Sequence, residues 1–121
     1  MARGAPPEEV FAAVAAEVGR VLEVDFTYLG RYEPDGAATA LAAWAMTGAG
    51  SRVRVGDRLE LGGRNVTTLV FQTRRPARID DYANASGTVS AAVLAAGMRS
   101  VVGAPVSVAG RLWGVMAVES T

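Results

Sequence analysis

The chain has 121 residues, of which 50% are hydrophobic, and its 12 basic and 12 acidic side chains give a formal net charge of zero. This length suits one domain with a single core, and the neutral charge argues against a nucleic-acid partner, which needs a strongly basic face. The chain holds no His and no Cys, which excludes Ser–His–Asp and Cys–His catalysis, thiol redox chemistry and the usual structural zinc sites. It also lacks an apolar run of the roughly 20 residues that a membrane span needs, so we expect no membrane span. Without Cys there is no disulfide framework, and we therefore expect a cytoplasmic domain.

The first predicted element is a helix from about Glu8 to Leu22. Two acidic residues, Glu8 and Glu9, lie in its first turn, where the helix dipole favours negative charge. Apolar residues at three- and four-residue spacing predict the side that packs on a sheet: Val10, Phe11, Val14, Val18, Val21 and Leu22. Small residues flank this stripe and leave two alternatives open, packing within one chain or against a second copy: Ala12, Ala13, Ala15 and Ala16.

An antiparallel hairpin is predicted next. Residues 26–32 are rich in aromatic side chains that suit a strand, and the Glu-Pro-Asp-Gly run at 33–36 is a turn. The chain returns over 39–46 as a second strand. Large side chains alternate along both strands, which most often indicates a core and alternatively an aromatic ligand pocket: Phe26, Tyr28, Trp44 and Met46.

The middle of the chain is predicted to combine short elements with turns. Segment 51–63 is polar and rich in Gly, with a short strand expected at 57–61. Asn65 is a good N-cap for a helix that runs from Val66 to Arg74. Pro76 ends this helix, because the residue before a proline disfavours the helical region.

After this helix we predict an extended piece over 77–79 and a loop over 80–84. A second short helix then begins after a cap at Ser86 or Thr88 and runs to Ala96, where Gly97 closes it in the left-handed region.

Charged residues around this loop allow two interpretations. Asp80, Asp81 and Tyr82 either border a ligand pocket, with Tyr82 stacking on the ligand, or form a capped loop with solvated carboxylates, which is the commoner case. The arginines at 74, 75 and 78 either bind an anion or form surface ion pairs with the two aspartates, and the second reading is favoured.

The C-terminal segment is predicted to be a hairpin of two Val-rich strands, at 100–108 and 112–118, joined by Ala-Gly-Arg at 109–111. The first strand is apolar on both faces, so we expect it to be mostly central. Pro105 predicts a bulge or a break there, because proline cannot donate to a sheet ladder. We expect Trp113 to close the sheet against the first helix.

Three long segments carry a shared pattern: PEEVFAAVAAEVGRVLEVDFTYLGRYEPDG (7–36), TRRPARIDDYANASG (73–87) and MRSVVGAPVSVAGRLWGVMAVES (98–120). Together they resemble the GAF domain, a small sensory module of signalling proteins, over nearly the whole chain. The Arg-Pro-Ala-Arg-Ile-Asp-Asp-Tyr run, with the Gly-Ala-Pro and Gly-Arg-Leu-Trp-Gly-Val elements, is similar to GAF domains of actinobacterial sensor histidine kinases.

The resemblance implies an α+β fold with a central antiparallel sheet of about six strands and flanking helices, a profilin-type sandwich like that of GAF and PAS domains. Residues 1–121 are expected to form a single such domain, with a ligand pocket roofed by the middle segments. GAF domains usually add a closing helix after the last strand. We therefore expect this chain to be an excised fragment of a longer signalling protein.

The resemblance also implies a function. We expect a sensory or regulatory domain, not itself an enzyme, that binds an unidentified small ligand and relays its state through flanking helices to a linked kinase or other output domain. The alternative is a ligand-free dimerisation or spacer module with a collapsed pocket. A homodimer is expected through helix 8–22 or the flanking helices.

No catalytic or metal-binding residue is expected, and the cofactor is unknown. Haem bound through His or a thiolate and bilin bound covalently through Cys are excluded, because the chain has neither residue. We expect a ligand to be contacted by residues of the two aromatic strands and of the middle segments: Tyr28, Trp44, Met46, Phe71, Ile79, Asp80, Asp81, Tyr82, Thr88, Val89 and Val93.

Overall fold

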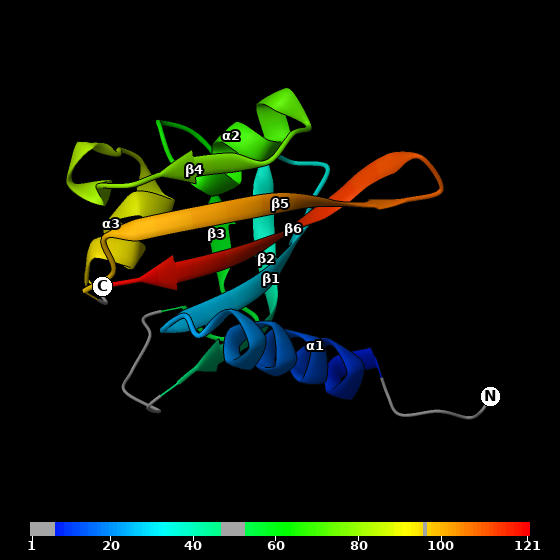
Figure 1. Cartoon of the computed structure of the whole chain (residues 1–121). Coiled ribbons are helices and arrows are strands. Elements are labelled where there is room, and N and C mark those ends of the chain that lie inside the picture. The colour runs from blue at the N-terminus through cyan, green and yellow to red at the C-terminus, as the bar shows by residue number, and fades with distance from the viewer. Residues whose placement is uncertain (1–6, 47–52, 96) are drawn as a thin grey trace.

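A six-stranded antiparallel sheet organises the chain (Figure 1). The computed structural model describes residues 7–46, 53–95 and 97–121. The strand order in the sheet is β3-β2-β1-β6-β5-β4, so the last strand of the chain lies beside the first at the centre. The strands are β1 (Phe26–Tyr32), β2 (Ala37–Ala45), β3 (Arg58–Glu60), β4 (Ala77–Ile79), β5 (Ser100–Val108) and β6 (Arg111–Ser120). The predicted α+β fold with about six strands is confirmed.

The helices cover both faces of the sheet, as Figure 1 shows. Helix α1 (Pro7–Leu22) packs on β1 and β2. The opposite face is covered by α2 (Val66–Thr73), the short 3₁₀ helix η1 (Tyr82–Asn84) and α3 (Thr88–Ala95). Two separate hydrophobic clusters result, one on each face. We call the face of the sheet that packs on α1 the α1 face, and the face under α2, η1 and α3 the covered face.

The turns that join the strands follow the chemistry predicted from sequence. In the β1–β2 hairpin Gly36 takes a φ of 91°, and the Glu33 amide donates to the carbonyl of Ala37 at 2.8 Å. In the β5–β6 hairpin both loop residues have positive φ, 53° at Ala109 and 77° at Gly110. Two such residues form the type I′ turn that matches the right-handed twist of paired strands. The predicted C-terminal hairpin is therefore confirmed.

The β5 strand is less central than its sequence predicts. Strand β4 pairs only with residues 101–103, so the outer half of β5 has β6 as its sole described neighbour. The apolar pattern continues into this edge, where Val108 is 56% exposed. A bulge lies between Val106 and Ser107, one residue after Pro105, which itself stays in register with Val115. The expected bulge is therefore present in β5, but it lies after Pro105 and not at the proline itself.

Helix α1 contacts the sheet through its small residues, which corrects the predicted apolar stripe. Ala15 and Gly19 are buried, whereas most of the predicted stripe is exposed at Val10, Val14, Val21 and Leu22. A Cβ added at Gly19 would lie 2.1 Å from the ring of Trp44, so the glycine allows helix and strand to approach closely. The larger apolar residues consequently lie beside the contact, partly open to solvent.

Candidate functional site

A network of hydroxyl groups lies on the covered face, between the sheet and α2. Tyr28 of β1 extends from the sheet, and its buried phenol shares a short hydrogen bond with the hydroxyl of Thr67 in α2. Tyr32, four residues further along β1, donates to the carbonyl oxygen of Thr67 at 2.6 Å. Residues separated by an even number of positions in a strand share a face, so both tyrosines reach the same helix. Burial raises the pKa of both phenols well above the ordinary range.

Tyr82 of η1 packs into the hydrophobic cluster of the covered face. Its phenol oxygen accepts a hydrogen bond from the Val66 amide at 2.6 Å, and its own amide donates to the carbonyl of Arg99 at 2.7 Å. The Val66 amide belongs to the first turn of α2, where no partner within the helix exists. Burial raises the pKa of Tyr82 to about 12. The Tyr82 ring is 1% exposed and forms part of the core.

The elements of the cover are fastened to each other through Asn65. Its side-chain oxygen caps α2 by accepting from the Thr68 amide at 2.9 Å, as the sequence predicts. Its side-chain nitrogen donates to the carbonyls of Gly62 and Ser86, at 2.8 and 3.0 Å. A Cβ added at Gly87 would lie 2.3 Å from the Gly62 carbonyl oxygen. Side-chain bonds and close backbone packing thus hold the start of α3 against the loop before α2.

Glu119 is a buried acid on the same face, and sequence reasoning did not single it out. It lies opposite Phe26 of β1 and Val101 of β5 in the sheet register, is 1% exposed, and its Oε2 has no hydrogen-bond partner. Burial raises its pKa to about 8. The signal was present in the sequence: Val115, Ala117 and Glu119 alternate on one face of β6, so the acid follows two inward residues.

The structure brings together five of the predicted contact residues. Tyr28, Ile79, Tyr82, Val89 and Val93 are each at most 3% exposed and belong to the cluster of the covered face. These residues line neither the groove beside α1 nor the pockets around Arg74 and Gly19. In this structure their side chains fill the space under the cover.

Trp44 and Met46 do not share this face, so the predicted set is divided between two faces. Trp44 lies opposite Thr27, whose hydroxyl donates to the Ala15 carbonyl of α1 at 2.7 Å, whereas Tyr28 lies opposite Ala43. Side chains alternate along a strand, so this register turns Trp44 towards α1 and away from Tyr28. Trp44 and Met46 line a shallow pocket with Gly19 instead.

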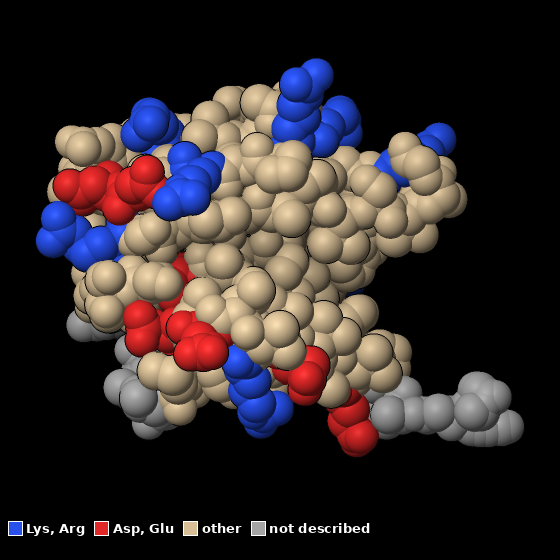
Figure 2. Space-filling view, in the orientation of Figure 1, with Lys and Arg blue, Asp and Glu red and all other residues tan. Residues whose placement is uncertain are grey.

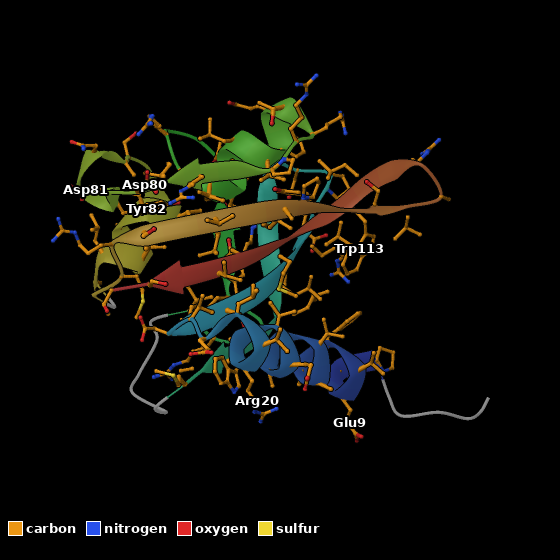
Figure 3. The ribbon with its side chains drawn as sticks, viewed as in Figure 1. Glu9, Arg20, Asp80, Asp81, Tyr82 and Trp113 are labelled. Atoms are coloured by element: carbon orange, nitrogen blue, oxygen red, sulfur yellow. The ribbon has the colours of Figure 1, made fainter. Side chains whose placement is uncertain are left out.

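The remaining predicted residues lie at the surface. Phe71 is 38% exposed and its ring packs on Tyr32 at a centroid distance of 5.0 Å, while Thr88 is exposed at the start of α3. Asp80 and Asp81 carry surface ion pairs, to Arg78 at 2.5 Å and to Arg99 at 3.1 Å. Figure 3 shows both aspartates on the outer side of the η1 region.

A hydrogen bond from the Ala83 amide, together with the ion pair to Arg99, lowers the pKa of Asp81. This aspartate caps η1, as its bond to Ala83 at 3.0 Å shows. The favoured reading of a capped loop with surface ion pairs agrees with these contacts. Arg74 and Arg75 take no part in the described ion pairs of the two aspartates.

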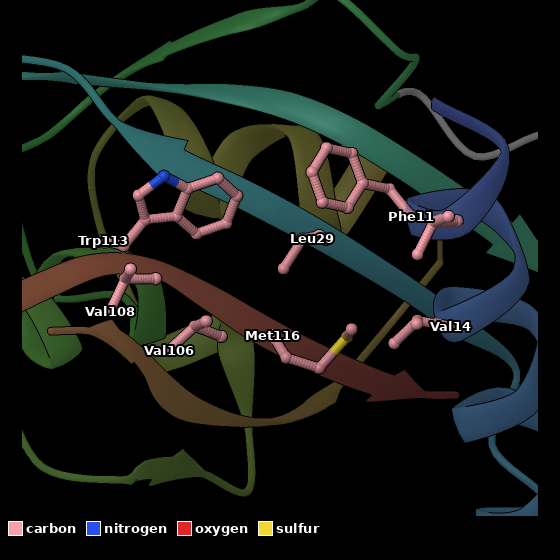
Figure 4. Close-up of a pocket in the computed structure, with 8 residues that line it drawn as sticks. Phe11, Val14, Leu29, Val106, Val108, Trp113 and Met116 are labelled. Atoms are coloured by element: carbon pink, nitrogen blue, oxygen red, sulfur yellow. The ribbon is translucent and has the colours of Figure 1, made fainter. Parts of the chain in front are cut away.

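An apolar groove of about 490 Å³ lies on the α1 face, between α1 and the β5–β6 hairpin (Figures 2 and 4). The Phe11 and Trp113 rings meet across it at a centroid distance of 5.9 Å, which agrees with the prediction that Trp113 closes the sheet against the first helix. The lining is formed by side chains of both elements and of β1: Val10, Phe11, Val14, Leu29, Val106, Val108, Trp113 and Met116.

Comparison with protein families decides what this fold is. The sequence pattern of the GAF domain matches residues 6–121. The chain belongs to the GAF family. GAF domains are sensory and regulatory modules of signalling proteins, so the coarse functional class predicted from sequence holds. A search of curated protein sequences gives no match.

Solved GAF domains share the fold at low sequence identity. The GAF domain of a Coxiella burnetii phosphoenolpyruvate-protein phosphotransferase superposes with a TM-score of 0.74 at 21% identity, over 96% of this chain and 69% of that one. The phycocyanobilin-bound GAF domain of a cyanobacterial phytochrome gives 0.70 at 18%, over 96% and 71%. The PixJ GAF domain of Thermosynechococcus elongatus gives 0.72 at 13%, over 93% and 68%.

The described part of the GAF domain contains no cluster of three acidic, His or Cys residues that could hold a metal ion. Within the same residues, no helix is both long enough and apolar enough to cross a membrane. Covalent attachment of a bilin through cysteine is excluded by the sequence, which has none.

Proposed function

We propose that this GAF domain is the sensory input of a signal-transduction protein, a two-component sensor histidine kinase. It binds a small ligand on the covered face, between the sheet and the segment from Ile79 to Val93. The observation that supports this site is Glu119, whose buried Oε2 lacks a partner among otherwise satisfied aromatic and hydroxyl groups. Buried polar atoms without partners are few in folded proteins, and a ligand with a hydrogen-bond donor would supply this one with a partner.

Binding acts by shifting the population of two packing states of the cover. The ligand favours the state in which its own contacts are made, and the shift is as large as the difference between its affinities for the two states. Strand β1 connects the two faces, because Tyr28 contacts α2 while the neighbouring Thr27 bonds to the Ala15 carbonyl of α1. A repacked cover therefore reaches α1, from which a flanking helix carries the state to the output domain.

A ligand screen tests the sensory proposal. The 121-residue chain is heated in the presence of a library of small metabolites, and hits are verified by native mass spectrometry of the purified domain. Binding to the folded state alone raises the midpoint of unfolding with ligand concentration. A library without any stabilising compound, together with a single unliganded mass, contradicts the proposal.

The groove on the α1 face supports a second candidate, a dimerisation or spacer module. Val14 of α1 and Val108 of β5 both line the groove and are 44% and 56% exposed. We propose that a second copy of the chain covers this apolar surface, since exposed apolar patches commonly mark interfaces. Sedimentation velocity across a concentration series tests it. A strictly monomeric chain that binds a metabolite contradicts this second function and favours the first.

A further inference from the structure

We propose that Glu119 anchors a small organic cation, a protonated amine or a guanidinium, held against the aromatic rings of the covered face. This inference rests on the proposed sensory function and names the ligand class for that site. The carboxylate would accept N–H donors from the cation, and Phe26 and Tyr28 would supply the ring surface beside it.

The register of the sheet places these groups together. Phe26 lies directly opposite Glu119 on the neighbouring strand, and Tyr28 lies opposite Ala117, which makes it the diagonal neighbour of the acid. Directly opposite side chains in an antiparallel pair have Cβ atoms about 5 Å apart, and diagonal ones about 7–8 Å. Glu119 also raises the pKa of both Tyr28 and Tyr82, after the larger effect of burial, so its charge reaches both phenols.

No cationic side chain of the described residues neutralises this acid. The described ion pairs of arginine are at the surface: Arg31 with Glu33, Arg58 with Asp35 and Glu60, Arg78 with Asp80, and Arg99 with Asp81. The titratable groups that face Glu119 are the phenols of Tyr28 and Tyr82. Arg64 lowers the pKa of Tyr82 and is not among the causes that shift the pKa of Tyr28 or Glu119. An unpaired buried carboxylate attracts a cation or keeps its proton.

The same surroundings favour an organic cation over a metal ion or an anion. A metal ion needs several hard ligands, and the described residues provide no cluster of three. An anion would be repelled by the carboxylate. Phe26, Tyr28 and Tyr82 are each 1% exposed, so their rings present a desolvated surface of the kind that attracts ammonium and guanidinium groups.

Because the residues of the covered face are closely packed, entry of the ligand depends on movement of the cover. Glu119 lies on β6, which is hydrogen-bonded to β1 on one edge and to β5 on the other, so the sheet itself is held in place. Movement must therefore come from η1 and α3. Segment 82–95 is fastened to the loop before α2 at Ser86 and Gly87.

Nuclear magnetic resonance titration with matched probes tests the inference. The full chain is titrated at pH 7.5 with methylguanidinium and with methylurea, which has a similar shape and no charge. The same titrations are run on Glu119→Gln and on the control Glu17→Gln, which alters an exposed acid of α1. We expect saturable shifts in β1, β6 and 82–95 with the cation alone, at least tenfold weaker in Glu119→Gln and unchanged in the control.

Equal binding of methylurea, or cation binding that persists in Glu119→Gln, overturns the cation inference and leaves the sensory function standing. A metabolite screen without any hit overturns the sensory function as well. If Glu119→Gln does not fold, the test is the affinity of the wild-type chain for methylguanidinium, measured at several pH values from 6 to 9. Cation affinity must rise with pH there, because the cation competes with the proton of Glu119, and a flat profile overturns the inference.

Discussion

The two faces of the sheet solve the same packing problem in different ways. On the covered face, side chains from three helical elements bury the sheet, and Phe26, Tyr28 and Tyr82 are each 1% exposed. On the α1 face a single helix rests on small residues, and an apolar groove remains open beside it. The covered face is complete except for one carboxyl oxygen without a hydrogen-bond partner, whereas the α1 face is incomplete in apolar area. A ligand suits the first deficit and a docking surface suits the second.

The largest expected effect separates the faces by stability. Phe26→Ala on the covered face removes a buried ring and should lower the free energy of unfolding by about 3–5 kcal/mol. Val21→Ala on α1, where the side chain is 67% exposed, should change it by no more than about 0.5 kcal/mol. Urea denaturation of both variants measures the difference. Similar losses would show that both faces are packed equally and would break the comparison.

The next effect is a pH dependence that belongs to the covered face alone. The pKa of Glu119 is raised to about 8 by burial, so between its ordinary value and pH 8 the folded state binds more protons than the unfolded state. Stability is therefore fully present at low pH and declines as pH rises through this window. The expected loss from this group is about 2–3 kcal/mol between pH 5 and pH 7.

Urea denaturation at several pH values checks this decline, with Glu119→Gln as the matched variant. The amide carries no charge, so the variant should lose most of the fall in stability. Glu33 and Asp81 have lowered pKa values, and their opposite dependence should then dominate at acid pH. A wild-type profile that is flat from pH 5 to 8 would argue that Glu119 already has a partner.

A smaller effect is expected from the phenol that joins the cover to α2. Tyr82→Phe keeps the ring and leaves the Val66 amide without its acceptor at 2.6 Å. An unsatisfied buried donor costs about 1–3 kcal/mol. Tyr32→Phe is the matched control, since its bond to the Thr67 carbonyl is only partly buried. Thermal unfolding of both variants should rank Tyr82→Phe as the more destabilised, and the reverse order would contradict the role of Tyr82 as a cap.

The sequence was sufficient for the order and type of the elements, because local chemistry determines them. Asn is a favoured N-cap residue, so Asn65 marks the start of a helix from its local chemistry alone. In the same way, the two-residue loop at 109–110 specifies a hairpin. The division of the site between faces was not predictable in this way. A strand register that differs by one residue moves Trp44 to the other face, and no local pattern states that register.

The same limit explains the errors on α1 and Glu119. The helix was expected to contact the sheet through its largest apolar residues, but the steric demand of Trp44 selects Gly19. That demand exists only once the strand and helix are adjacent. Glu119 lies at the end of an apolar strand, where an acid is ordinarily solvated. Its burial follows from the central position of β6 and from the cover above it, both of which are tertiary properties.

The smallest effect on stability is expected on the α1 face, where the consequence should appear in assembly instead. Val14 lines the groove and is 44% exposed, so Val14→Glu should change the free energy of unfolding by no more than about 0.5 kcal/mol. A charge placed in the groove opposes burial of this surface against a second copy. If the groove docks a second copy, sedimentation velocity should show a dimer for the wild type and a monomer for Val14→Glu.

Glu17→Gln provides the control for this experiment, because it alters the charge of the same helix at an exposed position that does not line the groove. A dimer that survives Val14→Glu would place the interface elsewhere. A variant that instead loses stability by as much as Phe26→Ala would mean that the groove belongs to the core. The α1 face would then be packed as completely as the covered face, and the contrast between a ligand site and a docking surface would lose its structural basis.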